Sequence, residues 1–174
     1  MGSKDLFATD RQDPPESGAE RPMLDGWLDY HRDTLLRKCA GLSADQLRRR
    51  SCDPSTLTLH GLVRHMAEVE GWFNNDCADG AVPPIFYSEE RPNDDFDALD
   101  DASIEDDVAT FRRMVERSRG FTARTQDLDT VCGTSRSGTD ITLRWIYLHM
   151  IEEYARHNGH ADLLRERIDG ATGD

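Results

Sequence analysis

The longest regular pattern of hydrophobic and polar residues runs from Leu143 to Gly170, near the C-terminal end of the chain. Along it, apolar side chains and metal-binding side chains recur at steps of three or four residues: Ile146, His149, Glu153, His157, His160 and Leu164. This spacing places them on one stripe of an α-helix, the stripe that ordinarily faces a protein core. Imidazole and carboxylate groups cost free energy when they are buried without a partner. The pattern therefore predicts one long helix whose inner stripe carries chemistry as well as packing.

Three earlier stretches repeat apolar residues at the same helical spacing: residues 23–41, 58–77 and 103–123. Thr58 and Ser103 stand at the starts of the second and third stretches, where a side-chain oxygen can cap a helix. Together with the C-terminal helix, these stretches make four long helices. The sequence therefore predicts an all-α fold, a four-helix bundle, in which sites are built from facing side chains inside the core.

The segments between these helices differ in composition. Residues 1–21 are rich in proline, glycine and charge and are predicted to be a flexible N-terminal tail, which leaves residues 22–174 as one domain. The polar loop 125–139 is expected to hold a short extended piece. Residues 81–102 form a long connection between the second and third helices, with a dense acidic run in the part 88–102. A connection of this length either covers the mouth of a site or crosses the surface.

Composition narrows the classes of function. The formal net charge is −13, which argues against nucleic-acid binding and against anionic membranes. No signal peptide or transmembrane run is recognised, so a cytoplasmic protein is expected. Cys39, Cys52, Cys77 and Cys132 form no C-x-x-C pair and are expected to be reduced thiols, with two disulfides as the alternative.

Three of the polar residues have the spacing and type of a metal site. Glu153 and His157 are four residues apart, so both side chains can reach one ion. His65 lies on the inward row of the second predicted helix and faces the same interior, whereas His60 is expected to be solvated. A set of two histidines and one glutamate on zinc leaves a fourth position open, which is typical of catalytic sites. An open zinc ion can activate water or hold a thiol as the thiolate.

The neighbouring histidines leave the interpretation open. His149 and His160 each lie about one helical turn from a predicted ligand and are hypothesised to surround the metal site or to orient a ligand. The alternative is a site without metal, in which Glu153 pairs with Arg156 and the two histidines are polar core residues. A metal with His149 or His160 as a fourth ligand would instead favour a non-catalytic site.

Two segments carry a resemblance to a known family: HGLVRHMAEVEGWF around His65, and LRWIYLHMIEEYARHNGHADLLRERIDG at the end of the chain. They resemble the DinB/YfiT-like superfamily, in particular its actinobacterial mini-circle-type branch, over roughly Leu24–Gly173. The resemblance implies a four-helix bundle of up-down-down-up topology, commonly a homodimer. It also implies a divalent metal, zinc or nickel, on three histidines, one from the second helix and two from an H-x-x-x-H pair on the fourth.

Residue by residue, His65 matches the ligand on the second helix and His157 matches the last ligand, whereas Glu153 stands where many members have histidine. The related mycothiol-dependent maleylpyruvate isomerase-like proteins use such a His-Glu-His set and bind a low-molecular-weight thiol as a metal thiolate. The resemblance therefore implies a metal-dependent S-transferase or isomerase that joins a mycothiol-type thiol to an electrophilic substrate. The alternatives are a metal-dependent hydrolase, with His149 or His160 as general base, and a non-catalytic metal-binding or stress-response bundle.

Overall fold

The computed structural model describes residues 6–77, 82–135 and 137–173, and within them the fold is mostly helical. Its elements, in chain order, are α1 (Glu20–Cys39), α2 (Ala44–Leu47), α3 (Leu59–Cys77), α4 (Asp94–Asp97), α5 (Ile104–Arg124), β1 (Val131–Thr134), β2 (Asp140–Thr142) and α6 (Leu143–Asp169). The all-α prediction is thus confirmed apart from one small antiparallel hairpin, in which Val131 lies opposite Thr142. The predicted ends of the four long helices agree closely with the observed ones, and the largest difference is the start of α1 at Glu20.

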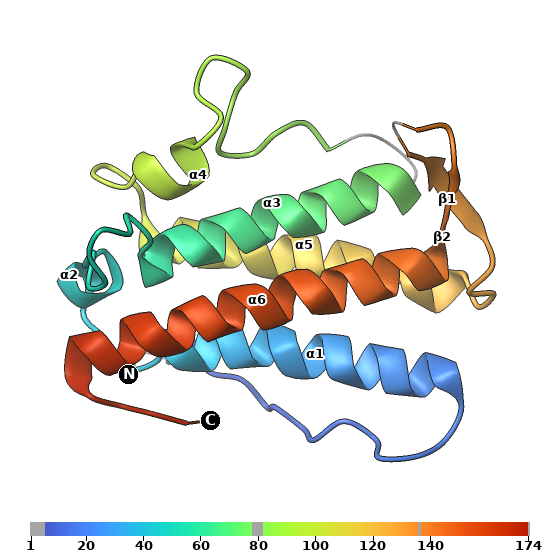
Figure 1. Cartoon of the computed structure of the whole chain (residues 1–174), viewed down its shortest axis with the longest axis horizontal. Helices are drawn as coiled ribbons and strands as arrows, with labels where there is room; N and C mark the ends of the chain where they lie inside the picture. Colours follow the sequence, from blue (N-terminus) through green and yellow to red (C-terminus); the bar gives the residue numbers. More distant parts are fainter. Residues whose placement is uncertain (1–5, 78–81, 136, 174) are drawn as a thin grey trace.

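Figure 1 shows the four long helices lying side by side, with α3 against α5, α1 against α6, and α3 against α6. In this view α1 and α6 run from right to left, whereas α3 and α5 run from left to right. The hairpin closes one end of the helices, and α4 lies on the outer side of α3. This arrangement brings the inner stripes of α3 and α6, which are far apart in the sequence, next to each other.

The helix ends follow local sequence rules. Ser103 and Thr142 accept backbone hydrogen bonds from Asp106 and Trp145, so each caps the helix that follows it. Gly170 ends α6 with a φ of 80°, a left-handed conformation that suits glycine at a helix C-terminus. The cap predicted at Ser103 is therefore confirmed, and Thr142 and Gly170 follow the same local rules.

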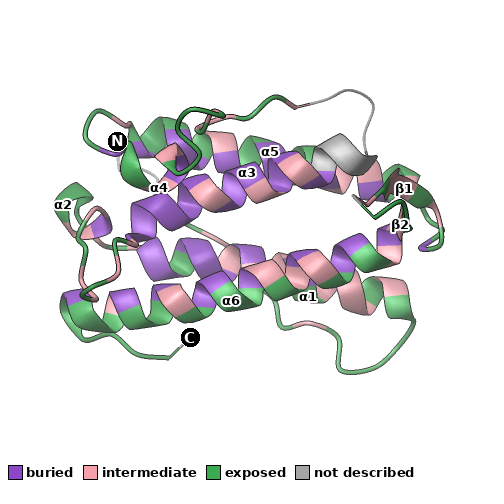
Figure 2. Ribbon diagram, turned by 45° about the horizontal axis from the view of Figure 1, so that its top comes forward, coloured by how far each residue is buried: buried purple, intermediate pink, exposed green. Residues whose placement is uncertain are grey.

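The core is made of apolar side chains on the sides of the helices that face one another, as the burial colours in Figure 2 show. The largest fully buried apolar side chains are Leu28, Leu35, Leu59, Leu62, Met66, Phe73, Phe111, Leu143, Ile146 and Met150. These residues come from α1, α3, α5 and α6, which explains why the four helices form one unit.

The beginning of the described segment before α1 packs against the helices. Phe7 is buried in the core, and Arg112 donates hydrogen bonds to the backbone oxygens of Leu6 and Ala8. The boundary predicted between a tail and a domain falls inside α1, because the helix begins at Glu20. Flexibility of residues 1–21 stays a prediction, and residues 1–5 lie outside the described part of the chain.

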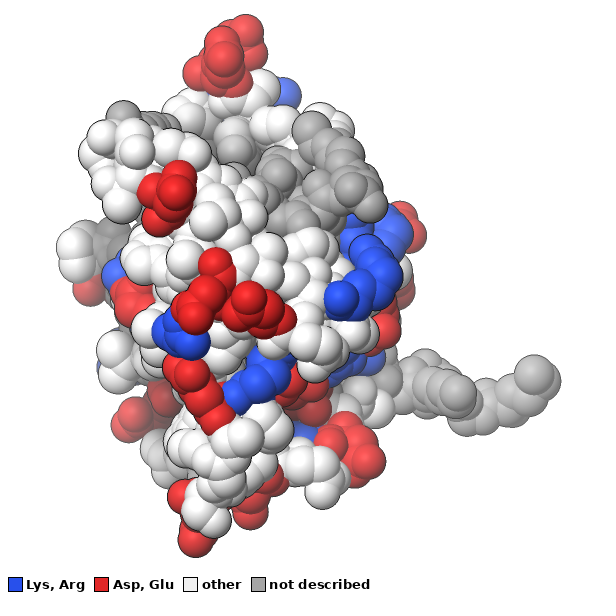
Figure 3. Space-filling model, turned by 90° about the vertical axis from the view of Figure 1, so that its right-hand side faces the viewer, with Lys and Arg blue, Asp and Glu red and all other residues white. Residues whose placement is uncertain are grey.

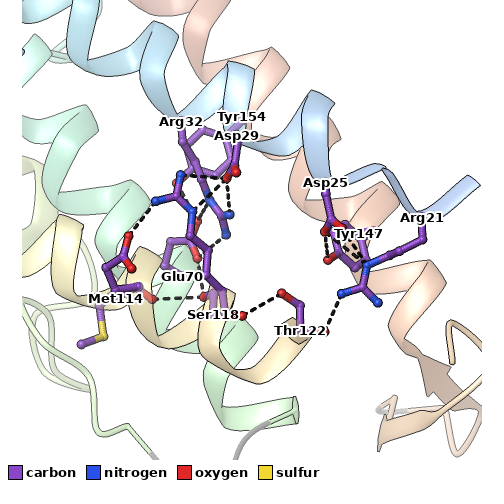
Figure 4. A network of polar contacts seen from close by, with 12 residues as sticks. Arg21, Asp25, Asp29, Arg32, Glu70, Met114, Ser118, Thr122, Tyr147 and Tyr154 are labelled. Carbon is purple, nitrogen blue, oxygen red and sulfur yellow. Dashed lines mark hydrogen bonds and ion pairs between the residues drawn. The ribbon is translucent and has the colours of Figure 1, made fainter. Parts of the chain in front are cut away.

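A network of charged and polar side chains crosses the core (Figure 4). Arg32 donates two hydrogen bonds to the Glu70 carboxylate, at 2.7 and 2.9 Å. Tyr154 and Ser118 also donate to this carboxylate, at 2.8 and 2.5 Å. Burial alone would lower the pKa of Arg32, but the charges of Glu70, Tyr154 and Asp29 and the hydrogen bond to Glu70 together outweigh it and raise that pKa. These four side chains, which we call the core network, join α1, α3, α5 and α6.

His60 corrects one expectation from the sequence. It is buried rather than solvated, and its Nε2 lies 2.7 Å from Oδ2 of Asp107 on α5. Arg64 donates to the same oxygen at 3.0 Å. The position near the helix start suggested exposure, but α5 packs over this end of α3 and covers it.

The molecular surface carries charges of both signs. On the face shown in Figure 3, at the end of the helices that holds the hairpin, acidic side chains lie beside basic ones. Among the described residues, no helix combines the length and apolar character that crossing a bilayer requires.

Candidate metal centre

The packing of α3 against α6 brings His65, Glu153 and His157 together. One ligand atom from each side chain lies within 4.8 Å of the others. Nε2 of His157 is 3.4 Å from Oε2 of Glu153, and the rings of His65 and His157 are 4.6 Å apart between centroids. Ligand atoms about 2.0–2.2 Å from a zinc ion lie roughly 3.3–3.6 Å apart in a tetrahedral set. The three side chains, which we call the triad, therefore have nearly the separation that one ion requires.

Burial of the triad is partial. The side chains of His157, Glu153 and His65 are 11%, 15% and 23% exposed, respectively. Each side chain thus keeps a part that is exposed to solvent, while most of it is packed inside the protein. This differs from the core network, whose Glu70 side chain is fully buried.

The long connection between α3 and α5 contributes directly to the site. Oδ2 of Asp95 on α4 lies 2.8 Å from Nδ1 of His65, and Phe96 stacks on the same ring at 4.6 Å. A carboxylate on one ring nitrogen fixes the tautomer and orientation of a histidine, which leaves Nε2 for a metal. Arg64 holds this segment in place by donating to the backbone oxygens of Asp94 and Asp95.

Asp95 is the site residue that the sequence reasoning missed. It belongs to the acidic run between the second and third predicted helices. For this run, the sequence allows two interpretations, a segment that covers a site or one that crosses the surface. The signal that distinguishes this part of the run is Phe96, a large apolar residue among aspartates, because such a residue tends to pack against the protein. Asp95 and Phe96 thus lie beside the triad, whereas a covering role of the whole connection stays a prediction.

The protonation of His157 favours metal binding. Burial lowers its pKa, and the nearby His65, His160 and Arg156 lower it further, to about 4. The imidazole is therefore neutral at neutral pH and keeps a lone pair on one ring nitrogen. Metal ions bind histidine in this neutral form.

The other two histidines of the stripe adjoin the triad. Nε2 of His149 is 4.0 Å from Oε1 of Glu153, and its Nδ1 is 3.4 Å from Oε2 of Glu152. Nδ1 of His160 is 3.4 Å from Nδ1 of His157. Each histidine thus contacts one member of the triad. These positions agree with the hypothesis that His149 and His160 surround the metal site or orient a ligand. The roles themselves stay predictions.

The alternative interpretation, an ion pair without metal, also has a structural basis. Nη1 of Arg156 lies 3.3 Å from Oε1 of Glu153, and Arg156 also contacts Glu152. Because the Arg156 side chain is 54% exposed, the free energy of these pairs is small. Glu153 presents one carboxylate oxygen to Arg156 and the other to His157.

The described cysteine side chains are Cys39, Cys52 and Cys132, and none of them forms a disulfide. The side chain of Cys77 lies outside the described part. Burial raises the pKa of Cys39 to about 12, which keeps its thiol protonated and unreactive. None of the described cysteines belongs to the ligand group at the triad.

A family model described as mycothiol-S-transferase matches residues 23–170, which is most of the chain. No match was found among curated proteins or among solved structures. The matched region includes most of α1, all of α3, α5 and α6, the triad and Asp95.

Proposed function

This chain belongs to the mycothiol-S-transferase family, within the DinB/YfiT-like superfamily, and from this premise we propose that it transfers the sulfur of a small thiol to an electrophile at a divalent metal. The metal would be held by His65, Glu153 and His157. The observation that carries the proposal is the convergence of these three ligand types within 4.8 Å at a partly exposed position.

The residues present fit a divalent metal. Two imidazoles and one carboxylate suit zinc, and they also suit nickel. His157 is held neutral by its surroundings, and Asp95 orients His65 through Nδ1 of its ring. Three protein ligands leave a position for a further ligand, which is typical of catalytic zinc sites.

A divalent cation in this position would lower the pKa of a bound thiol and favour the nucleophilic thiolate. The protein side chains would hold and orient the reactants around it. In the transfer, a bond forms between the thiol sulfur and the electrophilic carbon, the leaving group departs with its bonding electrons, and the thiol proton passes to solvent. His149 and His160 flank the triad, so we assign them the orientation of the thiol and the relay of that proton.

An isomerase would activate the thiol in the same way, but its substrate would release the thiol again after it has rearranged. A hydrolase would use water in place of the thiol, with His149 or His160 as general base. Membership in an S-transferase family favours the thiol over water. The third alternative, a non-catalytic metal-binding bundle, would require His149 or His160 to complete the ligand set. Each of them lies beside one triad member. His149 forms a second group of possible ligands with Glu152 and Glu153, whereas His160 belongs to neither group.

The remaining parts of the proposal concern the whole molecule. We propose the up-down-down-up bundle order, which the helix directions in Figure 1 support, and a homodimer that binds neither nucleic acid nor membranes. The net charge of −13 supports this choice of partners. We also propose a cytoplasmic location, because low-molecular-weight thiols and free cysteines belong to reducing compartments.

The test is metal content by elemental mass spectrometry on protein purified without chelator or histidine tag, beside a His157→Ala variant. We expect about one metal per chain in the wild type and a loss of metal in the variant, with thiol transfer reduced at least about 100-fold. A His31→Ala variant is the matched control, because His31 is a partly buried histidine that contacts Asn158 and not the triad. A folded wild type without metal, or a variant that keeps its full metal content, would contradict the proposal.

A further inference from the structure

Three aromatic rings lie together beside the triad on α3 and α6. Trp145 and His149 stack with centroids 4.9 Å apart and an interplanar angle of 26°. Trp72 meets both rings edge to face, at 6.3 Å from Trp145 and 5.3 Å from His149. We call Trp72, Trp145 and His149 the aromatic cluster.

The aromatic cluster is accessible from solvent. Trp145 is 47% exposed, and the His149 side chain is 33% exposed. A single exposed tryptophan is ordinary on a protein surface. Here each of three rings contacts the other two, so their orientations are set before any ligand arrives, and little conformational entropy would be lost on binding.

The aromatic cluster continues the row that forms the triad. Trp145, His149, Glu153 and His157 follow one another at steps of four residues on α6. Each step advances about 6 Å along a helix, so His149 and Trp145 lie roughly 6 and 12 Å from Glu153 along the axis. His149 joins the two groups, since its Nε2 is 4.0 Å from Oε1 of Glu153. A substrate whose reacting atom lies at the triad can therefore contact the aromatic cluster with another of its groups. That group needs to be separated from the reacting atom by about the length of one ring system.

The charges beside the aromatic cluster limit which chemical groups can bind there. Glu152 and Glu153 lie beside His149, and Arg156, which pairs with both, offsets only one of the two negative charges. The net local charge therefore disfavours an anionic group at this position. Aromatic faces and edges favour planar rings through offset or edge-to-face contacts. We propose that the aromatic cluster binds an uncharged aromatic portion of the electrophilic substrate and thereby sets substrate specificity. This inference rests on the proposed function for the identity of the substrate, but binding of the ring can be measured without any reaction.

The first test measures binding of 4-nitrobenzamide, an uncharged and unreactive aromatic probe, to the metal-containing protein by titration calorimetry. We expect Trp145→Ala to weaken binding about tenfold and Trp145→Phe to restore most of the loss. Leu148→Ala is the matched control, because Leu148 is 55% exposed on the same helix and lies outside the aromatic cluster. Leu148→Ala should leave the affinity within about twofold of the wild type. Equal affinity of wild type and Trp145→Ala, or no binding to either, would overturn the inference.

The second test compares two electrophiles in thiol transfer with mycothiol as donor. With 1-chloro-2,4-dinitrobenzene, the sulfur–carbon bond forms while the carbon–chlorine bond breaks, and chloride and a proton are released. We expect Trp145→Ala to raise KM for this aromatic substrate about tenfold with little change in kcat. The KM for iodoacetamide, which has no ring, should not change. An equal effect on both electrophiles would contradict a specificity role for Trp145.

The two proposals fail separately in these tests. Probe binding that depends on Trp145, without thiol transfer to either electrophile, would contradict the proposed function and support the aromatic site. Thiol transfer that is indifferent to Trp145 for both electrophiles would support the function and overturn the aromatic site.

Discussion

The core network and the triad are two polar groups in the same helical protein, and both draw residues from α3 and α6. Tyr154 of the core network even follows Glu153 of the triad directly in the sequence. In the core network, opposite charges meet and the Glu70 carboxylate accepts hydrogen bonds from three side chains. In the triad, two imidazoles and a carboxylate converge at a partly exposed position, and burial together with neighbouring histidines lowers the pKa of His157.

The difference between these groups separates a structural role from a binding role. The hydrogen-bonding capacity of the core network is used within the protein, so its side chains are expected to hold the helices in register. The triad brings together nitrogen and oxygen atoms that all donate lone pairs, and an added cation would stabilise this arrangement by binding to them. Adjacent residues on one helix can thus serve different purposes because they point to different sides of it.

The largest expected effect that tests this comparison is on folding stability. Glu70→Ala would leave the Arg32 charge buried without its main partner, so we expect the free energy of unfolding to fall by about 3–5 kcal/mol. Glu153→Ala should change it by less than about 1 kcal/mol in metal-depleted protein, because Glu153 forms only partly exposed ion pairs. Urea unfolding of both variants measures the difference.

A double variant controls for the loss of packing at Glu70. Arg32→Met combined with Glu70→Leu removes both charges and keeps apolar volume, so it should recover most of the lost stability. Similar stability losses in Glu70→Ala and Glu153→Ala would show that the two groups do not differ in the way proposed here.

The next effect concerns the carboxylate that orients His65. Asp95→Asn keeps the size of the side chain but replaces the carboxylate next to Nδ1, so we expect metal affinity to fall about 10–100-fold. Competition with a zinc chelator measures this affinity. Asp97→Asn, a nearby exposed member of the acidic run, is the control and should bind metal like the wild type. Loss of affinity in both variants would point to the overall charge of the segment instead of the contact with His65.

The smallest expected effect concerns a third polar group, His60 with Asp107. Burial alone would raise the pKa of Asp107, but hydrogen bonds from His60 and Arg64 outweigh it and hold the pKa below its ordinary value of 3.8. Because folding lowers this pKa, the carboxylate stabilises the protein above pH 3.8, and the contribution is lost as the pH falls through the lowered value. At pH 7, Asp107→Asn should therefore cost about 1 kcal/mol.

Urea unfolding of wild type and Asp107→Asn between pH 7 and pH 2 measures this dependence. The difference between the two proteins is the informative quantity, because protonation of other groups affects both of them. We expect the difference to be constant at neutral pH and to shrink below about pH 4. A difference that stays constant over the whole range would mean that the charge of Asp107 does not contribute.

Local rules were sufficient for much of the fold. The four long helices, the caps at Ser103 and Thr142 and the terminal Gly170 follow from spacing and residue type within a few positions. The inner stripe of α6 could also be predicted from the sequence, because residues four apart on a helix must lie on one face. This spacing alone was enough to predict that Glu153 and His157 lie together. His65 could be predicted as the third ligand because it occupies an inward position on a second helix.

Contacts between distant segments were decided by the tertiary structure. Arg32 and Glu70 are 38 residues apart, and Asp95 is 30 residues from His65, and neither pairing leaves a periodic signal in the sequence. The same holds for the contact of Trp72 with Trp145 and for the burial of Phe7 and His60. Helical periodicity tells which way a side chain points, because it depends only on local backbone geometry. Which side chain lies opposite depends on how the helices pack and where the long connection rests. The sequence alone therefore determined the helices and the ligand stripe, whereas packing decided which groups surround the triad.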